Sequence, residues 1–184
     1  MVITQKTTIR NYELLGIVFI TILGSVMHFT FELSGNQPIV GVFSAVNESV
    51  WEHLKLGFWP SIIYLLIEYK QIKPKTNNYL LAKTAVPYTI TAVIPAIFYT
   101  YTAFTKESIL MIDILSFIIA VIIAQLVSYK LLTHKQLPAY TQKIAFVALL
   151  VLLVAFVVFT FYPPHNPLFQ DPISGEYGII NSHH

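Results

Sequence analysis

The sequence contains no cysteine and few charged residues. The lack of cysteine among 184 residues excludes disulfides, thiolate metal ligands and cysteine nucleophiles. Charged residues make up 11% of the chain, well below the share of about 25% in soluble domains. Because 55% of the residues are apolar, we expect the outer surface to face lipid. The composition predicts an integral membrane protein whose partner is the lipid bilayer, with no role for nucleic acid.

Five apolar stretches predict transmembrane helices, since the hydrocarbon core of a bilayer requires roughly 20 helical residues. The predicted helices cover residues 14–31, 48–70, 79–104, 109–132 and 144–162, with an outer loop at 32–47 and an outer tail at 163–184. The predicted fold class is an all-α membrane bundle of about five helices, formed by a single domain over residues 1–184. His183 and His184 end the chain in the manner of a tag remnant and are excluded from the functional argument.

Basic residues are concentrated on one side of the predicted bundle. Nine of the eleven lie before the first helix or around the second and fourth connections: Lys6, Arg10, Lys70, Lys73, Lys75, Lys83, Lys130, Lys135 and Lys143. Only Lys55 and Lys106 fall on the other side. The positive-inside rule then predicts a cytoplasmic N-terminus, an ordered extracytoplasmic tail and a multi-pass location in the plasma membrane.

Groups with chemical capacity gather at the predicted outer face. His28 and Glu32 are four residues apart, so they lie on one face of the first helix. At the start of the second helix, Glu48 shares a face with Glu52, and His53 lies beside Glu52 in sequence. Ionisable groups at the membrane surface are functional candidates because burying them is expensive.

The tail after the last helix is rich in proline but carries the apolar pair Leu168 and Phe169. It is too polar to span a bilayer and too apolar for a free coil. We expect it to fold back over the outer ends of the helices, with Leu168 and Phe169 packed against them and Asp171 held by hydrogen bonds. This arrangement would bring His165 towards the outer loop.

These groups predict a divalent metal site, because catalytic zinc takes three protein ligands and a water molecule. The predicted ligands are His28, Glu32, His53 and His165, and the predicted catalytic groups are Glu52, as general base, and Glu48. Supporting roles are expected for Asn47, Ser49, Trp51, Lys55, Asp113, Asn166 and Asp171. The spacing matches no named metal motif. The hypothesis requires the side chains of His28 and His53 to lie within roughly 8 Å of each other.

The same residues have structural explanations. Glu48 and Glu52 are typical of acids in the first turns of a helix capped by Asn47. Trp51 is typical of the aromatic belt at a membrane interface, and Lys55 could extend its ammonium group to the surface. Asp113 could cap a helix or pair with a nearby group. In that case the carboxylates would pair with Lys55 or with the histidines.

Two segments resemble the signatures of an uncharacterised family of small multi-pass prokaryotic membrane proteins. The first is GVFSAVNESVWEHLK, from Gly41 to Lys55. The second is PPHNPLFQDP, from Pro163 to Pro172, followed by Gly175, Tyr177 and Gly178. The resemblance extends over most of the chain. It implies a membrane location and about five helices, and it implies no activity.

A more distant resemblance is to the membrane hydrolases that include alkaline ceramidases and progestin/adipoQ receptors. That superfamily uses serine, aspartate and three histidines around zinc in a seven-helix bundle. The matching residue types here are Ser25, His28, His53, Asp113 and His165. This chain departs from the pattern in its lower helix count, its lack of paired histidines on a late helix and the spacing of Ser25 and His28.

Three classes of function fit these observations. The first is a metal-dependent membrane enzyme acting on a lipid or lipid-linked substrate at the outer face. The second is a transporter or a subunit that binds a cation or small solute. The third is a structural membrane protein that docks a partner. The inner halves of the helices offer little polarity beyond Ser116, Gln125 and Ser128, which favours the enzyme over the transporter. The substrate and the oligomeric state stay open.

Overall fold

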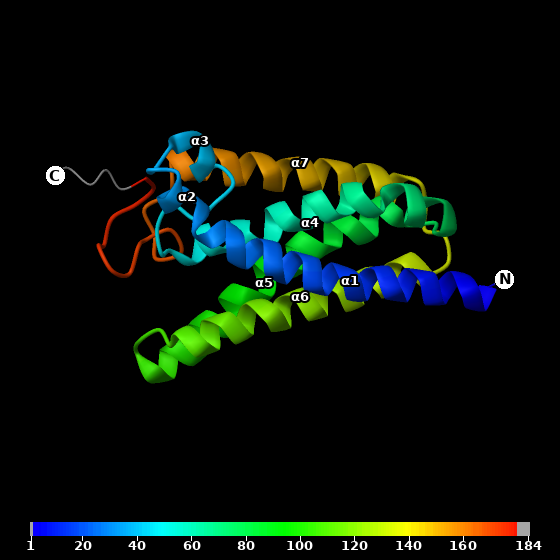
Figure 1. The fold of residues 1–184 in the computed structure, drawn as a ribbon, viewed down its shortest axis with the longest axis horizontal. Helices are drawn as coiled ribbons and strands as arrows, with labels where there is room; N and C mark the ends of the chain where they lie inside the picture. The colour runs from blue at the N-terminus through cyan, green and yellow to red at the C-terminus, as the bar shows by residue number, and fades with distance from the viewer. Residues whose placement is uncertain (1, 180–184) are drawn as a thin grey trace.

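The computed structural model describes residues 2–179, with side chains from residue 5 onwards, and shows an all-α bundle (Figure 1). The helices are α1 (Val2–His28), α2 (Thr30–Leu33), α3 (Pro38–Gly41), α4 (Val50–Ile72), α5 (Tyr79–Thr105), α6 (Leu110–Thr133) and α7 (Tyr140–Phe161), with a 3₁₀ turn at Lys73–Lys75. Within the described residues, β pairing is confined to one isolated bridge between Gln170 and Tyr177. His183 and His184 lie outside this range.

Four of the described helices are long and apolar enough to cross a membrane: Gln5–His28 within α1, and α5, α6 and α7. Large apolar side chains cover their outer surfaces, so the predicted all-α membrane bundle is confirmed. α1 begins at Val2, well before the apolar stretch that starts at residue 14. Hydropathy marks where a helix meets lipid, whereas the backbone helix continues through the polar residues before it.

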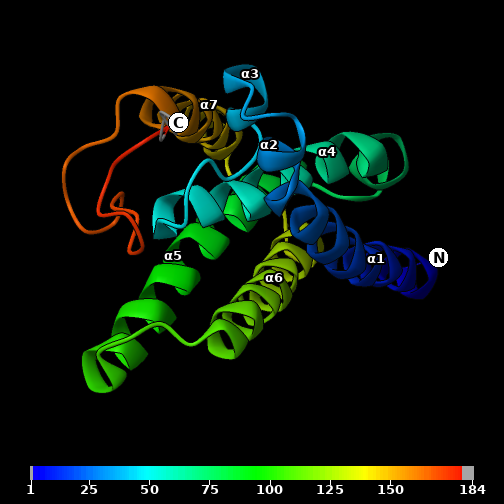
Figure 2. The same cartoon turned by 60° about the vertical axis from the view of Figure 1, so that its left-hand side comes forward.

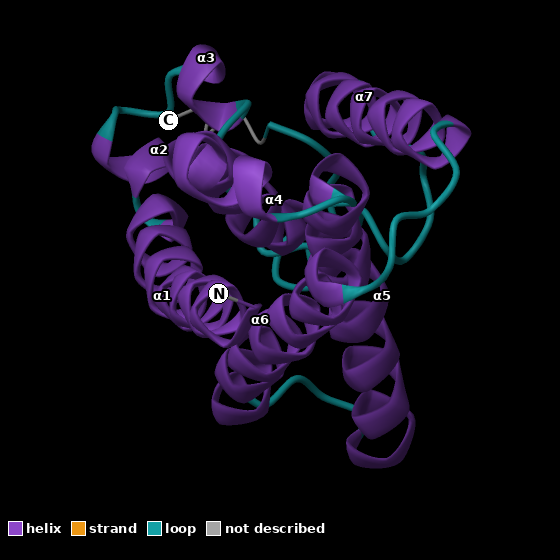
Figure 3. Ribbon diagram, turned by 90° about the vertical axis from the view of Figure 1, so that its right-hand side faces the viewer, coloured by secondary structure: helices purple, strands orange, loops and turns teal. Residues whose placement is uncertain are grey.

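The fifth long helix, α4, differs from the other four because it lies inside the bundle. It packs against α1 and α5, and the view along the bundle shows it between α1 and α7 (Figure 3). Thirteen of its 23 residues are buried. The side chains of Glu52, Lys55 and Glu68 therefore face protein instead of lipid, and for this reason the composition of α4 does not resemble that of a lipid-exposed span.

Glycine allows α4 to approach its neighbours closely. A β-carbon at Gly24 of α1 would lie 2.4 Å from the carbonyl oxygen of Leu56, and one at Gly57 would lie 2.6 Å from the Ile90 side chain. Small residues at such crossings let helix backbones pack tightly in membranes. The Gly24 contact fixes the last turn of α1 against the first half of α4.

One end of the bundle, which we call the site end, holds the end of α1, the start of α4 and the C-terminal tail (Figure 2). The segment predicted as a plain loop at 32–47 contains the short helices α2 and α3. The apolar side chains of Leu33 and Ile39 on these helices are exposed. The site end therefore combines a polar interior with an apolar rim.

The tail folds back over the site end, as predicted. The backbone N–H of Trp51 donates to the carbonyl of Leu168 at 3.0 Å, and the Phe169 ring is buried with its centroid 4.8 Å from that of Trp51. Asp171 accepts from the backbone N–H groups of Ile173 and Ser174. The expected packing of Leu168 and Phe169 and the hydrogen bonding of Asp171 are confirmed.

Candidate metal centre

The start of α4 sets the geometry of the candidate site. Ser49 is the N-cap of this helix, and its hydroxyl accepts the backbone N–H of Glu52 at 3.3 Å. The side-chain oxygen of Asn47 accepts the backbone N–H of Ser49 at 2.9 Å. The cap is therefore Ser49, not Asn47 as the sequence suggested, and Glu48 lies outside the helix. Its side chain is free to turn away from Glu52.

Three potential ligand atoms converge where α1 ends and α4 begins. His28 Nε2 lies 3.1 Å from His53 Nε2. The Glu48 carboxylate oxygen Oε2 lies 3.4 Å from His53 Nε2 and 3.9 Å from His28 Nε2. Among the residues with described side chains, these three form the group whose ligand atoms all lie within 4.8 Å of one another. We call this group the His–Glu–His triad.

The hydrogen bond made by the other ring nitrogen of His53 identifies its tautomer. His53 Nδ1 lies 2.9 Å from the carbonyl oxygen of Ser49. A carbonyl oxygen can only accept, so Nδ1 carries a proton. In the neutral ring the Nε2 lone pair faces His28 and Glu48, and in the protonated ring Nε2 donates to the Glu48 carboxylate. Orientation of a ligating histidine by a backbone carbonyl is the usual second interaction in metal sites.

The distances suit a metal ion at the centre. At the usual Zn–N and Zn–O bond lengths of about 2.0–2.2 Å, tetrahedral ligands lie about 3.3–3.5 Å apart. The observed separations of 3.1, 3.4 and 3.9 Å bracket this value. The three side chains remain 31–45% exposed, so one side of the triad stays open. The side chains of His28 and His53 therefore lie well within the 8 Å that the metal hypothesis requires.

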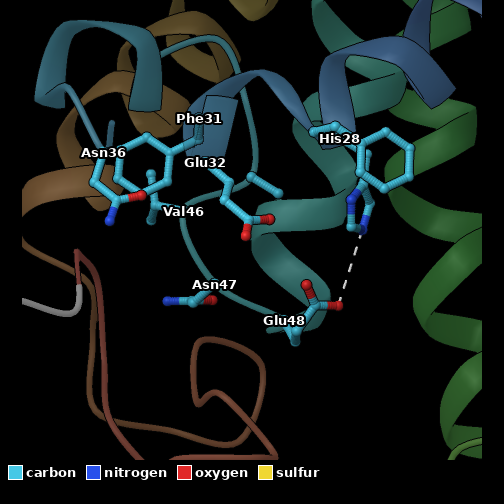
Figure 4. A pocket seen from close by; sticks show the side chains of 9 residues that line it. His28, Phe31, Glu32, Asn36, Val46, Asn47 and Glu48 are labelled. Carbon is cyan, nitrogen blue, oxygen red and sulfur yellow. Dashed lines mark ion pairs between the residues drawn. The ribbon is translucent and has the colours of Figure 1, made fainter. Parts of the chain in front are cut away.

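A pocket of about 280 Å³ adjoins the triad (Figure 4). His28, Glu32 and Glu48 contribute its ionisable groups, and Asn47 contributes an amide. Glu32 is exposed and points into the same pocket, although it is not among the three converging ligands. The structure thus places Glu32 as a neighbour of the triad, where the sequence predicted a ligand.

Electrostatics keep Glu48 in its ligand form. The hydrogen bond with His53 lowers the pKa of the Glu48 carboxyl below its ordinary value, the nearby histidine charges act in the same direction, and partial burial opposes them. Glu48 is therefore ionised at neutral pH. The sequence assigned it a catalytic role, whereas the geometry makes it the carboxylate member of the triad.

Glu52 occupies a different environment from the one predicted. It is buried, its Oε2 lies 2.5 Å from Lys55 Nζ, and the same oxygen accepts the backbone N–H of Val46 at 3.0 Å. Lys55 is fully buried and also donates to the Gly41 carbonyl and the Thr160 hydroxyl. A carboxylate held in this way cannot reach the pocket as a base, and Lys55 does not snorkel to the surface.

Four other predicted residues lie away from the triad. Trp51 is buried against Phe169 and the rings of α7 and is not part of an interfacial belt. His165 stacks on Tyr177 with ring centroids 4.5 Å apart and is not brought to the triad. The remaining two make local bonds: Asp113 accepts from the Tyr101 hydroxyl at 2.6 Å, and Asn166 accepts from the backbone N–H of Leu168.

The structure also shows a buried charge cluster that the sequence analysis missed. Lys83 Nζ lies 2.5 Å from Glu13 Oε1 and 2.6 Å from Glu68 Oε1, and all three residues are buried. They come from α1, α5 and α4, at the end of the bundle opposite the triad. The sequence feature that could have indicated this cluster is Glu68, a single acid within a largely apolar stretch of helix.

Comparison with known proteins gives a family and no activity. No curated protein matches the chain, and no solved structure matches it. The resemblance to alkaline ceramidases and their relatives therefore receives no support. A family model described as "Family of unknown function (DUF6512)" matches residues 1–179, which is consistent with the resemblance to an uncharacterised family. The chain belongs to this family of unknown function, DUF6512.

Proposed function

We propose that this membrane protein is a metal-dependent hydrolase or transferase that acts on a lipid or lipid-linked substrate. The convergence of His28, Glu48 and His53 supports the proposal, because three lone pairs face one point and the fourth side is open. Two histidines and a glutamate are a ligand set of catalytic zinc, to which water adds as the fourth ligand.

Zinc would supply a water molecule that ionises near neutral pH and attacks an ester or related bond. Glu32 is the general base in this proposal, since it is exposed, lines the pocket beside His28 and has no place among the ligands. It replaces Glu52, whose carboxylate is bound to Lys55 and Val46.

A lipid substrate is favoured by the apolar rim of the site end. Phe29 borders the pocket and is 58% exposed, and Leu33 and Ile39 are more exposed still. A single molecule with a polar head in the pocket and an apolar tail along these side chains would satisfy both surfaces. In this proposal the site end lies outside the cell at the plasma membrane, because the basic residues are concentrated towards the other end of the bundle.

Metal analysis of purified protein tests the proposal. We expect about one zinc ion per chain, and we expect His53→Ala and Glu48→Ala to reduce the bound zinc to a small fraction. His165→Ala is the matched control, because His165 lies outside the triad, and it should bind zinc like the wild type. Full zinc occupancy in His53→Ala would overturn the metal site.

The reaction is tested separately by incubating the zinc-loaded protein with vesicles of phospholipids and ceramide and following product release. Glu32→Gln should retain zinc and lose most activity, because it removes the base and leaves the ligands. If Glu32→Gln binds zinc and releases product at the wild-type rate, Glu32 is not the base. Bound zinc without turnover of any of these lipids would favour the structural, partner-docking alternative over the enzyme.

A further inference from the structure

The buried cluster of Glu13, Glu68 and Lys83 carries an imbalance of charge. Two carboxylates share one ammonium group, which lies 2.5 Å from Glu13 and 2.6 Å from Glu68. Lys55 and Lys83 are the buried lysines within residues 5–179, and Lys55 is at the other end of α4, paired with Glu52. With every group ionised, the cluster would keep one unpaired negative charge.

Among the described side chains, Lys83 is the cation paired with Glu13 and Glu68, and Arg10, three residues before Glu13, is exposed. Ile9, Leu65 and Ile72 belong to one buried apolar cluster, and each is three or four residues from Glu13 or Glu68 on the same helix. Two tyrosines also face the cluster: Tyr64 donates to the Tyr12 carbonyl and Tyr79 to the Leu65 carbonyl, both at 2.5 Å. The Tyr79 hydroxyl is also a hydrogen-bonding neighbour of Glu68, but it is neutral and does not balance the charge. An unpaired charge in such an environment is strongly unfavourable, so a neutral cluster is favoured.

Carboxylate oxygens of both Glu13 and Glu68 lack well-placed hydrogen-bond donors. Glu13 Oε2 and both carboxylate oxygens of Glu68 are buried and accept no well-formed hydrogen bond within the described part of the chain, although Glu68 Oε1 lies at ion-pair distance from Lys83. A proton on one carboxyl would remove the excess charge and provide a donor. A metal ion suits this site poorly, because the ammonium group of Lys83 already lies between the carboxylates and would repel it.

We propose that the Glu13–Lys83–Glu68 cluster binds one exchangeable proton in the folded protein. The proton is held by Glu13 or Glu68, with Lys83 at ion-pair distance from both. Glu68 lies 16 residues after Glu52 on α4, which corresponds to about 24 Å of helix. The proton site is thus separate from the triad and does not depend on the proposed metal chemistry.

Infrared difference spectroscopy across a pH jump tests this inference on the purified full-length protein. A protonated carboxylic acid has a C=O stretching band distinct from that of a carboxylate. We expect one such band per chain in the wild type at neutral pH, and we expect Glu68→Gln and Glu13→Gln each to remove it. Glu107→Gln changes an exposed acid in the α5–α6 connection and is the matched control. A band that persists in both cluster variants would overturn the proposal.

Thermal unfolding gives a second measurement. Glu68→Gln keeps a neutral group at this position, so it should fold. Its stability advantage over the wild type should grow as the pH rises above the unfolded-state carboxyl pKa of about 4.3, and should level off once the folded wild-type cluster has lost its proton. A constant difference across the pH range would contradict the inference. The infrared band should be the same in sodium chloride and in choline chloride. If the band disappears in sodium chloride, the cluster binds a sodium ion instead of a proton, and the proposal is overturned.

Discussion

The ammonium nitrogen of Lys55 lies 2.5 Å from the carboxylate of Glu52, and both side chains are almost completely buried. Removing one partner leaves a charge unpaired inside the bundle, and such changes destabilise proteins by about 3–5 kcal/mol. We expect Lys55→Met to lower the free energy of unfolding by about this amount in detergent. Adding Glu52→Leu should recover part of the loss. Lys106→Met alters an exposed lysine and should have little effect, and an equal loss there would refute the argument.

The contact at Gly24 controls the position of His28. A methyl group at Gly24 would clash with the Leu56 carbonyl oxygen, which is backbone and cannot move alone. We therefore expect Gly24→Ala to shift α1 away from α4 and to weaken zinc binding at least about tenfold, the scale reported for disturbed supporting contacts. Ser25→Ala changes an exposed neighbour and should bind zinc normally. Titration with a competing chelator measures both affinities.

The low pKa of Glu48 predicts the direction of its effect on stability. The hydrogen bond with His53 lowers the pKa of the folded-state carboxyl. Its stabilising contribution is therefore complete above the unfolded-state pKa of about 4.3 and is lost as the pH falls through the lower folded-state value. Metal-free wild type should lose thermal stability relative to Glu48→Gln below about pH 4.3. A difference that is constant with pH would contradict the Glu48–His53 interaction.

The anchor of the tail is Phe169, which is buried against Trp51. We expect Phe169→Ala to release the tail and make it sensitive to limited proteolysis, because removal of a buried phenylalanine costs about 3–5 kcal/mol. Ile173→Ala is the control, as Ile173 is 82% exposed. Equal cleavage rates in the two variants would show that Phe169 does not hold the tail.

The orientation of the bundle is a prediction from the basic residues. A reporter fused after Gly178 should report an extracytoplasmic position, and one fused near Lys75 should report a cytoplasmic one. The reverse pattern would place the triad and its pocket on the cytoplasmic side. It would leave their geometry unchanged but would exclude a substrate that arrives from outside.

The pairing of His28 and His53 could be predicted because a short outer connection joins their helices. The role of Glu48 could not, since it depends on where α4 begins. Counting from a helix that starts at residue 48 puts Glu48 and Glu52 on one face, whereas capping by Ser49 turns Glu48 towards His53 and leaves Glu52 facing Lys55. A shift of two residues in a helix start lies within the usual uncertainty of boundaries.

The cluster around Lys83 escaped prediction for another reason. Glu13, Glu68 and Lys83 lie near the basic residues that indicated the cytoplasmic side, and each was compatible with a solvated position. Their convergence results from packing between α1, α4 and α5. Hydrophobic patterns describe which face of a helix is buried but do not specify which neighbouring helix it meets.

The hydrogen bond from the Asn47 side chain to the Gly178 carbonyl joins positions 131 residues apart. During synthesis, α1 and α4 enter the membrane long before Gly178 leaves the ribosome, so the loop that carries Glu48 waits for the final segment of the chain. The site end is therefore completed only after all seven helices, α1 to α7, have been made. A chain that stops before Leu168 would still contain every helix and all three triad residues, yet it would lack the cover that holds the Glu48 loop in position.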